Sequence, residues 1–350
     1  MLPMQIDQLF KTAVKKNASD LHLLVGKPPI LRVDGTLCEI PGLPELNAKT
    51  TQELVFSILS EKQQKKFVEE RELDVSYEIA GLSRFRVNLH WEKGFPGLVA
   101  RVIAGIIPTL EQITMPQMVY DLCRLPQGLI LITGPTGCGK STALAAMINL
   151  INSERSAHII TLEDPIEFMF EPKKCIIKQR QLGTDTLSFA AGLKHVLRQD
   201  PNVVMVGEMR DLETIATTIT LAETGHLVLA TLHTYSAAQT IDRIIDIFPP
   251  YQQNQIRLQL SITLKSVISQ RLISKIGGGR IAAREFLINT PAISNMIREN
   301  KIAQIKSAIQ TGADIGMRTL DQDLIELFEK QFITKEAAQA QMLNPEELPG

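Results

Sequence analysis

The sequence predicts an α/β protein of two domains, in which the second domain carries a doubly wound parallel sheet. Short, nearly all-apolar runs occur at residues 128–133, 158–162, 202–206 and 227–231. Such runs are typical of parallel strands buried on both faces. Helical patterns separate them, as expected for a doubly wound sheet. The length of 350 residues is enough for about two domains.

The residues before the first apolar run are expected to form a mixed α/β domain with an antiparallel sheet. Amphipathic periodicity predicts helices at residues 5–16, 49–59 and 61–70. Alternation of apolar and polar residues predicts strands at residues 19–23, 73–79, 83–90 and 97–103. Val33-Asp34-Gly35-Thr36 indicates a hairpin turn. Two prolines within residues 107–116 make this segment the best candidate for a linker.

The chain after residue 250 is expected to be helical. Residues 251–273 have the apolar spacing of one long helix, whose inner side would carry Ile256, Leu260, Leu264, Val267 and Ile268. Gly277-Gly278-Gly279 would end this region, and a helical segment would follow. The predicted boundaries are residues 1–110 for the N-terminal domain, 111–120 for the linker, 121–275 for the second domain and 276–350 for the C-terminal helical segment.

Composition excludes several classes of protein. The 37 basic and 38 acidic residues give a net charge of −1, so we expect no nucleic-acid partner. No apolar run reaches the length of about 18 residues that a membrane span needs. The N-terminus lacks the pattern of a signal peptide. The four cysteines form no C-x-x-C pair, which disfavours a structural zinc site.

The strongest motif is GPTGCGKST, at residues 134–142, which matches G-x-x-x-x-G-K-[ST]. It lies between a buried strand and an expected helix, as a phosphate-binding loop must. Its glycines let backbone N–H groups curl around phosphate oxygens at a helix N-terminus. Lys140 is expected to reach the β- and γ-phosphates, and Ser141 to place a hydroxyl on Mg²⁺. The residues expected to bind ATP are Gly134, Pro135, Thr136, Gly137, Cys138, Gly139, Lys140, Ser141 and Thr142.

Two carboxylates follow predicted strands and are candidates for the chemistry. The usual second nucleotide-binding motif is an apolar strand that ends in Asp-Glu, where the aspartate meets the metal and the glutamate orients water. Here the run Val203–Val206 is followed by Gly207 at the aspartate position and by Glu208 at the water-orienting position. Glu163 ends the run before it and could activate water or hold Mg²⁺ through a water molecule. Both lie at the sheet edge where open α/β sheets bind ligands. The alternatives are an ion pair between Glu208 and Arg210, and a simple turn after Glu163.

Two histidines flank the last predicted strand of the parallel sheet. His233 follows the strand, at the edge where a sensor of the γ-phosphate would stand, so we expect a catalytic role. His226 precedes the strand, at its opposite end, and is a weaker catalytic candidate that could instead face a neighbouring subunit. A structural role is the alternative for both.

Arginines gather in the N-terminal domain. Arg84, Arg86 and Asn88 alternate along one strand and therefore share a face. Together with Arg101 they could neutralise a triphosphate held by a neighbouring domain, as arginine fingers do. The alternative is a solvated charged face whose arginines pair with Glu72 or Asp74.

The order of four motifs, GPTGCGKST, HIITLEDPIEF, VVMVGEMRD and AETGHLVLATLH, resembles the hexameric secretion ATPase superfamily. Within it, the chain resembles the type IV pilus retraction ATPases of twitching motility, the PilT family. SDLHL, SRFRVN and GMRTLDQDL extend the likeness over nearly the whole chain. AISNMIRE, at residues 292–299, is similar to the AIRNLIRE element of that family, with Ser294 where the family usually has arginine.

The resemblance implies a PAS-like N-terminal domain, a RecA-like ATPase domain and a homohexameric ring, in which Arg84, Arg86 and Arg101 reach ATP across a subunit boundary. It also implies a cytoplasmic motor that docks on an inner-membrane pilus platform protein and retracts pili. A pilus-extension or type II secretion ATPase is the alternative, although the large N-terminal domain and four-cysteine element usual there are not found. A RecA-like DNA translocase is an alternative of a different class, disfavoured by the charge balance and the single Trp91.

Overall fold

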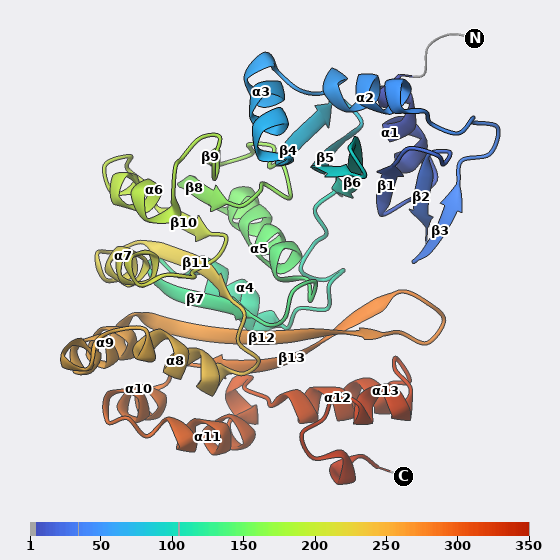
Figure 1. Ribbon diagram of the computed structural model, residues 1–350. Helices are drawn as coiled ribbons and strands as arrows, with labels where there is room; N and C mark the ends of the chain where they lie inside the picture. Colours follow the sequence, from blue (N-terminus) through green and yellow to red (C-terminus); the bar gives the residue numbers. More distant parts are fainter. Residues whose placement is uncertain (1–4, 34, 104–105, 350) are drawn as a thin grey trace. The chain divides into compact units, whose positions relative to one another are not determined.

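The computed structural model describes residues 5–33, 35–103 and 106–349, and the chain divides into two compact units (Figure 1). The first unit contains Met1–Ile106 and Glu167–Met169, and the second contains Ile107–Ile166 and Phe170–Gly350. Asp34, at the predicted hairpin turn, lies outside the described residues. Among the described residues, no helix has the length and apolar character needed to cross a bilayer.

The first unit is built on a six-stranded antiparallel sheet in the order β3-β2-β1-β6-β5-β4 (Figure 1). Its strands are β1 (Asp20–Leu23), β2 (Ile30–Val33), β3 (Thr36–Glu39), β4 (Glu72–Ile79), β5 (Ser83–Glu92) and β6 (Phe95–Ile103). Its helices are α1 (Ile6–Lys15), α2 (Ala48–Ser57) and α3 (Glu61–Glu70). The predicted helices and antiparallel strands of this region are confirmed, with ends shifted by a few residues.

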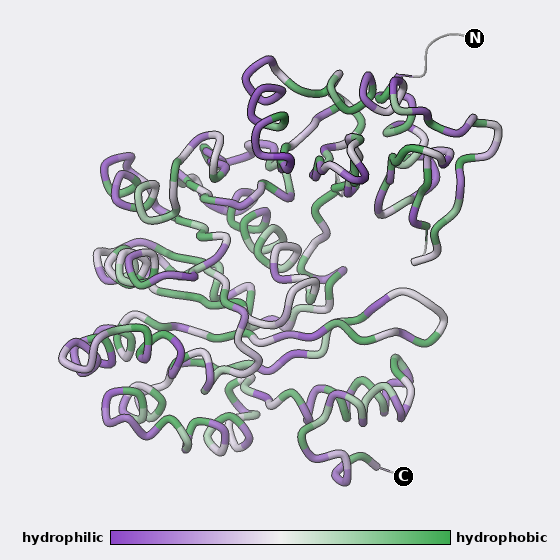
Figure 2. The backbone as a smooth tube through the Cα atoms, in the orientation of Figure 1, coloured by the Kyte–Doolittle hydropathy of each residue, from purple (hydrophilic) through white to green (hydrophobic). Residues whose placement is uncertain are grey.

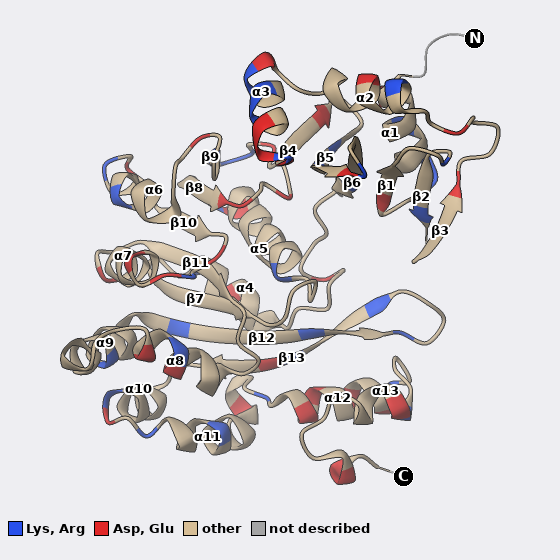
Figure 3. Cartoon of the chain, viewed as in Figure 1, with Lys and Arg blue, Asp and Glu red and all other residues tan. Residues whose placement is uncertain are grey.

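The core of the first unit forms between α1, α2 and one face of the sheet. The ring of Phe10 on α1 stacks on Phe85 of β5, with centroids 4.3 Å apart. Phe85 and the residues at two-residue spacing after it point into this core, since alternate strand residues face the same side. Helix α3 carries acidic and basic residues along most of its length, while its Phe67 is buried in the core (Figure 3). Its N-terminus is fixed by a capping box between Ser60 and Gln63.

The second unit is built on a seven-stranded sheet in the order β13-β12-β7-β11-β10-β8-β9. The strands from β12 to β9 are parallel, and β13 pairs antiparallel with β12 at one edge. The strands are β7 (Gly128–Thr133), β8 (His158–Glu163), β9 (Ile176–Gln181), β10 (Val203–Val206), β11 (Leu227–Leu232), β12 (Leu264–Ser274) and β13 (Arg280–Ile288). The four predicted parallel strands are confirmed.

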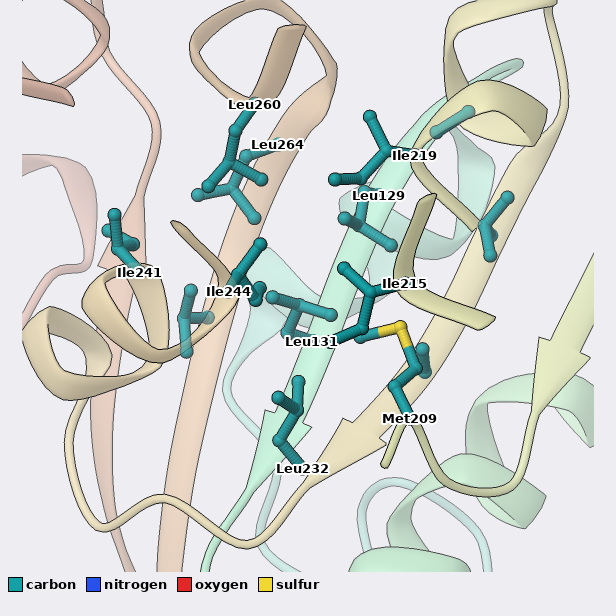
Figure 4. Packing of buried hydrophobic residues seen from close by; sticks show 14 of the residues in the cluster. Leu129, Leu131, Met209, Ile215, Ile219, Leu232, Ile241, Ile244, Leu260 and Leu264 are labelled. Atoms are coloured by element: carbon teal, nitrogen blue, oxygen red, sulfur yellow. The ribbon is translucent and has the colours of Figure 1, made fainter. Parts of the chain in front are cut away.

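Helices cover both faces of this sheet, as a doubly wound fold requires. They are α4 (Gln117–Arg124), α5 (Lys140–Glu154), α6 (Phe189–Val196), α7 (Leu212–Glu223), α8 (Ala237–Asp246), α9 (Pro250–Thr263), α10 (Pro291–Arg298), α11 (Ile305–Thr311), α12 (Leu320–Glu329) and α13 (Lys335–Gln339). Helices α7, α8 and α9 pack against β7 and β11 through buried aliphatic side chains (Figure 4). Every residue of β7 and β11 is buried, and these strands are hydrophobic along most of their length (Figure 2).

The prediction of one long helix over residues 251–273 is wrong. Helix α9 ends at Thr263, and the chain continues at once as β12, which carries Leu264, Val267 and Ile268. Only Ile256 and Leu260 of the predicted inner side are helical. No glycine or proline marks the change, and a short apolar run fits a buried strand as well as a helix.

The predicted C-terminal helical segment begins with a strand. Gly277, Gly278 and Gly279 all have positive φ angles and form the turn between β12 and β13. The glycines therefore reverse the chain within a hairpin. Helices α10 to α13 then follow, as predicted for this part of the chain.

Candidate active site

The phosphate-binding loop joins β7 to α5. Gly134, Gly137 and Gly139 have φ angles of 139°, 77° and 89°, in a region that L side chains rarely adopt. Helix α5 begins at Lys140, so the loop residues lie at the N-terminus of a 15-residue helix. Backbone N–H groups and the helix dipole together favour an anion at this place. The predicted context of the loop is confirmed.

Gly134 is required by the close approach of β12. A Cβ atom on Gly134 would lie 2.3 Å from the carbonyl oxygen of Gln270 and 2.7 Å from Sγ of Cys138. The Lys140 ammonium donates hydrogen bonds to the carbonyls of Gly134, at 2.8 Å, and Pro135, at 3.0 Å. Burial raises the pKa of the Cys138 thiol, which keeps the thiol protonated and unreactive.

Glu208 follows β10, and its carboxylate contacts the side chains of Arg210 and His233. Its Oε1 lies 3.0 Å from Nε2 of His233 and 2.6 Å from Nε of Arg210, whose Nη2 donates to Oε2 at 2.7 Å. Burial opposes ionisation of this carboxyl, but the hydrogen bonds from Arg210 and the charge of His233 outweigh it and lower the pKa of Glu208. The alternative ion pair with Arg210 is therefore present, and it coexists with the contact to His233.

The glycine before Glu208 is explained by crowding from a neighbouring strand. The N–H of Gly207 donates to the carbonyl of Leu162 at 2.7 Å, and its own carbonyl accepts from Thr231 Oγ1 at 2.5 Å. A Cβ atom on Gly207 would lie 3.0 Å from the carbonyl oxygen of Leu162 and 3.3 Å from Cα of Glu163. A side chain at this position would push β8 and β10 apart, so no metal-binding aspartate can stand there without a shift of the strands.

Glu163 ends β8 and is almost fully buried, with 6% of its surface exposed. Its Oε1 accepts hydrogen bonds from Thr161 Oγ1, at 2.6 Å, and from Gln179 Nε2, at 3.1 Å. Strands β8 and β10 pair in parallel with Leu162 opposite Val206, so Glu163 reaches the same sheet edge as Glu208. The structure thus brings both predicted carboxylates and His233 to the edge that holds the phosphate-binding loop.

His226 is not brought to this edge. It directly precedes β11, whereas His233 directly follows it, and seven residues of strand span about 23 Å. Its Nδ1 lies 2.9 Å from the carbonyl oxygen of Leu221 and 3.2 Å from Oγ1 of Thr224. The structure thus places His226 at the opposite end of β11 from His233, as predicted, with its ring in contact with the end of α7. A catalytic role of His226 remains a prediction.

The three candidate arginines lie in the first unit. Arg84 and Arg86 alternate on β5 with core residues, and Arg86 pairs directly opposite Arg101 of β6. Arg101 is anchored by the buried Asp20, whose Oδ1 accepts from its Nε at 3.0 Å. The side chain of Asp74 accepts from Asn88 instead of from an arginine. A role of these arginines at the phosphates remains a prediction.

Several residues around the site had no signal in the sequence. Gln270 donates through Nε2 to the carbonyl of Cys138 at 2.8 Å, and it lies on β12, where the sequence pattern predicts a helix. Glu285 of β13 is buried and accepts from the N–H of Ala237 at 2.7 Å, at the start of α8. Glu285 thereby fixes the segment that follows His233. Both residues depend on the β12–β13 hairpin, which the sequence reading missed.

The fold and the site define an ATPase of the P-loop class, with a phosphate-binding loop, two carboxylates and a histidine at one edge of a largely parallel sheet. The chain belongs to the type II/IV secretion system protein family, whose model matches residues 1–307.

Relatives of known name cover nearly the whole chain. It is 50% identical over 343 residues to the type IV pilus retraction ATPase PilT of Pseudomonas aeruginosa, covering 98% of this chain and 99% of that protein. It is 47% identical to a twitching motility protein of Neisseria gonorrhoeae, over 91% of this chain and 86% of the relative. The crystal structure of the pilus retraction motor PilT with bound ADP matches with a TM-score of 0.93 and 46% identity, over 99% of both chains. This likeness confirms the predicted N-terminal domain and RecA-like ATPase domain.

Proposed function

We propose that this chain is an ATP-hydrolysing motor that drives type IV pilus retraction. The observation that carries the proposal is the complete phosphate-binding loop at the same sheet edge as the Glu208–His233 contact. The full-length likeness to proteins named as pilus retraction and twitching motility proteins supports the choice of the pilus as the object that is moved.

Nucleotide binding is assigned to residues 134–142. Phosphate oxygens would accept from the backbone N–H groups of the loop and face the N-terminus of α5. The Lys140 ammonium would exchange the carbonyls of Gly134 and Pro135 for phosphate oxygens. This exchange replaces neutral acceptors by anionic ones, which bind an ammonium more strongly.

The oxygen ligands that the site offers suit Mg²⁺. The hydroxyl of Ser141 and the carboxylate of Glu163 are hard donors of the kind Mg²⁺ prefers. Position 207 is a glycine, so no carboxylate stands where the usual motif has its aspartate. Bound at this site, Mg²⁺ would neutralise phosphate charge. Ser141 would bind it directly, and the buried Glu163 would act through a water molecule.

Glu208 is the residue that we assign to the attacking water. Its low pKa keeps the carboxylate ionised at neutral pH, so both oxygens accept hydrogen bonds. It can therefore orient a water molecule for in-line attack on the γ-phosphate. His233, in contact with Glu208, would report whether that phosphate is present.

Arginines of one subunit would complete the site of another in a homohexameric ring. Arg84, Arg86 and Arg101 place three cations on one sheet face of the first unit. Supplied across a subunit boundary, they would neutralise charge in the transition state and make hydrolysis depend on assembly. The motor would work in the cytoplasm, docked on an inner-membrane platform protein at the base of the pilus.

Two measurements test this function. Lys140→Ala should abolish ATP hydrolysis by the purified protein, and full residual turnover would exclude the proposed site. In a strain that lacks the gene, a retraction motor predicts excess surface pili and no twitching, and restored twitching on complementation. Loss of pili would instead indicate an extension or secretion motor, and stimulation of turnover by DNA would indicate a translocase.

A further inference from the structure

A buried pair of side chains, Gln270 and Arg284, joins the phosphate-binding loop to the segment that leads out of the second unit. The two residues face each other across the β12–β13 hairpin. Gln270 is 2% exposed and Arg284 is 4% exposed.

The pair contacts the loop at one end. Nε2 of Gln270 donates to the carbonyl oxygen of Cys138 at 2.8 Å, and the backbone carbonyl of Gln270 packs against Gly134. Nε2 also lies 3.3 Å from where a Cβ atom of Gly139 would stand. Gln270 therefore supports both the start and the end of the turn that would enclose phosphate.

Arg284 fixes which way the amide of Gln270 faces. Its Nε donates to Oε1 of Gln270 at 3.3 Å. The other end of that amide, the donor Nε2, therefore faces the carbonyl oxygen of Cys138. A guanidinium has donors only, so the order of donors and acceptors along this chain of hydrogen bonds is fixed.

The pair contacts the linker at the other end. Nη2 of Arg284 donates to the carbonyl of Ile113 at 2.7 Å, and Nη1 donates to the carbonyl of Thr114 at 3.2 Å. These residues close a turn in which Met115 N–H donates to the carbonyl of Leu110 and Thr114 has a φ of 55°. We call residues 110–115 the linker turn, because they lie at the start of the second unit, a few residues after the main segment of the first unit ends at Ile106.

A buried guanidinium of this kind is costly, so its position calls for an explanation. The bonded acceptors around its side chain are the carbonyls of Ile113 and Thr114, the Thr114 hydroxyl and the Gln270 amide oxygen, all of them neutral. Asp323 accepts from the backbone N–H of Arg284 at 2.7 Å. Burial lowers the pKa of Arg284 to about 10, which still leaves it charged at neutral pH. An apolar pair of similar size would fill the same space without the cost of burying a charge.

We propose that Gln270 and Arg284 are positioning residues that transmit the occupancy of the phosphate-binding loop to the linker turn. When a nucleoside di- or triphosphate reshapes the loop, the carbonyl of Cys138 moves, and the rigid amide–guanidinium chain carries the change to Ile113 and Thr114. The inference rests on the proposed function, because it needs a nucleotide in the loop. It adds a route by which that nucleotide acts on the first segment of the second unit, which follows the first unit along the chain.

The test is hydrogen–deuterium exchange of the full chain with and without ADP, read at the amides of the loop and of the linker turn. In the wild type, ADP should slow exchange in both segments. Gln270→Glu keeps an acceptor for Arg284 but cannot donate to the carbonyl of Cys138. It should keep ADP-dependent protection of the loop, with affinity changed by no more than about tenfold, and lose the response of the linker turn.

A matched control distinguishes transmission to the linker turn from a general loss of stability in β12. Ser266→Ala removes another fully buried hydrogen bond of β12, from Oγ to the carbonyl of Leu287 at 2.8 Å, without touching the loop. It should leave the response of the linker turn unchanged. Arg284→Lys cannot donate to Gln270 and to both linker carbonyls at once, so it should lose the response of the linker turn as Gln270→Glu does. If Gln270→Glu does not fold, Arg284→Lys provides the test.

The outcomes are distinguishable. Persistence of the linker response in folded Gln270→Glu and Arg284→Lys would overturn the proposal, and so would ADP binding by the wild type with no response of the linker turn. If titration shows that the wild type does not bind ADP at all, that result contradicts the proposed function and also this inference.

Discussion

The imidazole Nε2 of His233 lies 3.0 Å from the carboxylate Oε1 of Glu208. The two residues follow neighbouring parallel strands, because β10 and β11 pair with Val206 opposite Ala230. Both side chains remain partly exposed, at 42% for His233 and 19% for Glu208. The contact is thus held by strand register and is open to a substrate at the edge of the sheet.

Glu208→Gln should bind nucleotide but hydrolyse ATP very slowly. The amide keeps the shape of the carboxylate but loses its charge and one acceptor, so kcat should fall by about 10²–10⁴-fold while ADP affinity changes little. Phosphate release and ADP titration measure the two effects separately. Glu223→Gln, on the exposed end of α7, is the control and should keep wild-type turnover. If the Glu208 variant keeps the wild-type kcat, a group other than Glu208 orients the attacking water.

Arg210→Ala should shift the acidic limb of the pH–rate profile to higher pH. Hydrogen bonds from Arg210 help to hold the pKa of Glu208 below its usual value, so their removal raises that pKa. Hydrolysis needs the ionised carboxylate, and activity is lost as pH falls through the pKa; the loss will therefore begin at higher pH in the variant. The measurement is kcat/KM against pH. Arg124→Ala breaks a comparable arginine–glutamate pair with Glu154 elsewhere, and its profile should match the wild type.

Gly134→Ala should abolish nucleotide binding and destabilise the fold. The added methyl would meet the Gln270 carbonyl at 2.3 Å, and the φ of 139° is strained for alanine. We expect a loss of about 1–3 kcal/mol in the free energy of unfolding, measured by urea denaturation with an ADP titration alongside. Gly42→Ala also has a positive φ, of 80°, but no atom within 4 Å of the new methyl. Equal effects of the two variants would show that strain alone, and not the contact with β12, governs Gly134.

Arg101→Ala should keep the native mass of the assembly and lose ATP hydrolysis. Its guanidinium would act in a site built on another subunit, so a mixture of Arg101→Ala and Lys140→Ala chains should recover part of the activity that each lacks alone. Arg32→Ala removes the other arginine near Asp20, at 3.8 Å, and should leave turnover close to wild type. If the mixture stays inactive, or if Arg32→Ala is as damaging, Arg101 serves the packing of the first unit instead.

The sequence predicted the part of the site that local pattern determines. An apolar run, a glycine-rich turn and a helix start are contiguous, so the phosphate-binding loop was found with its boundaries. Glu163 and Glu208 were predicted to share one edge because each follows a run buried on both faces, and parallel strands end at one edge. His233 was predicted to lie there by the same reasoning. The structure places all three at that edge, and their roles remain predictions.

The part that the sequence missed depends on contacts between distant segments. The chain passes from α9 to β12 between Thr263 and Leu264 without a turn residue, so the apolar pattern of this region predicts one continuous helix. Gln270, Arg284 and Glu285 acquire their roles only when that run pairs with β7 and β13, which are distant in sequence. The ring contacts of His226 likewise come from the end of α7.

The place of β13 at the edge of the sheet bears on how this protein can be divided or recombined. A chain ended at residue 275, where the second domain was expected to stop, would leave β12 without its antiparallel partner β13. The row of unpaired backbone groups on that side would be a template for aggregation. The shortened chain would also lose Glu285, which anchors the start of α8 behind His233. Chimaeras between related motors should therefore exchange residues 264–288 as one block.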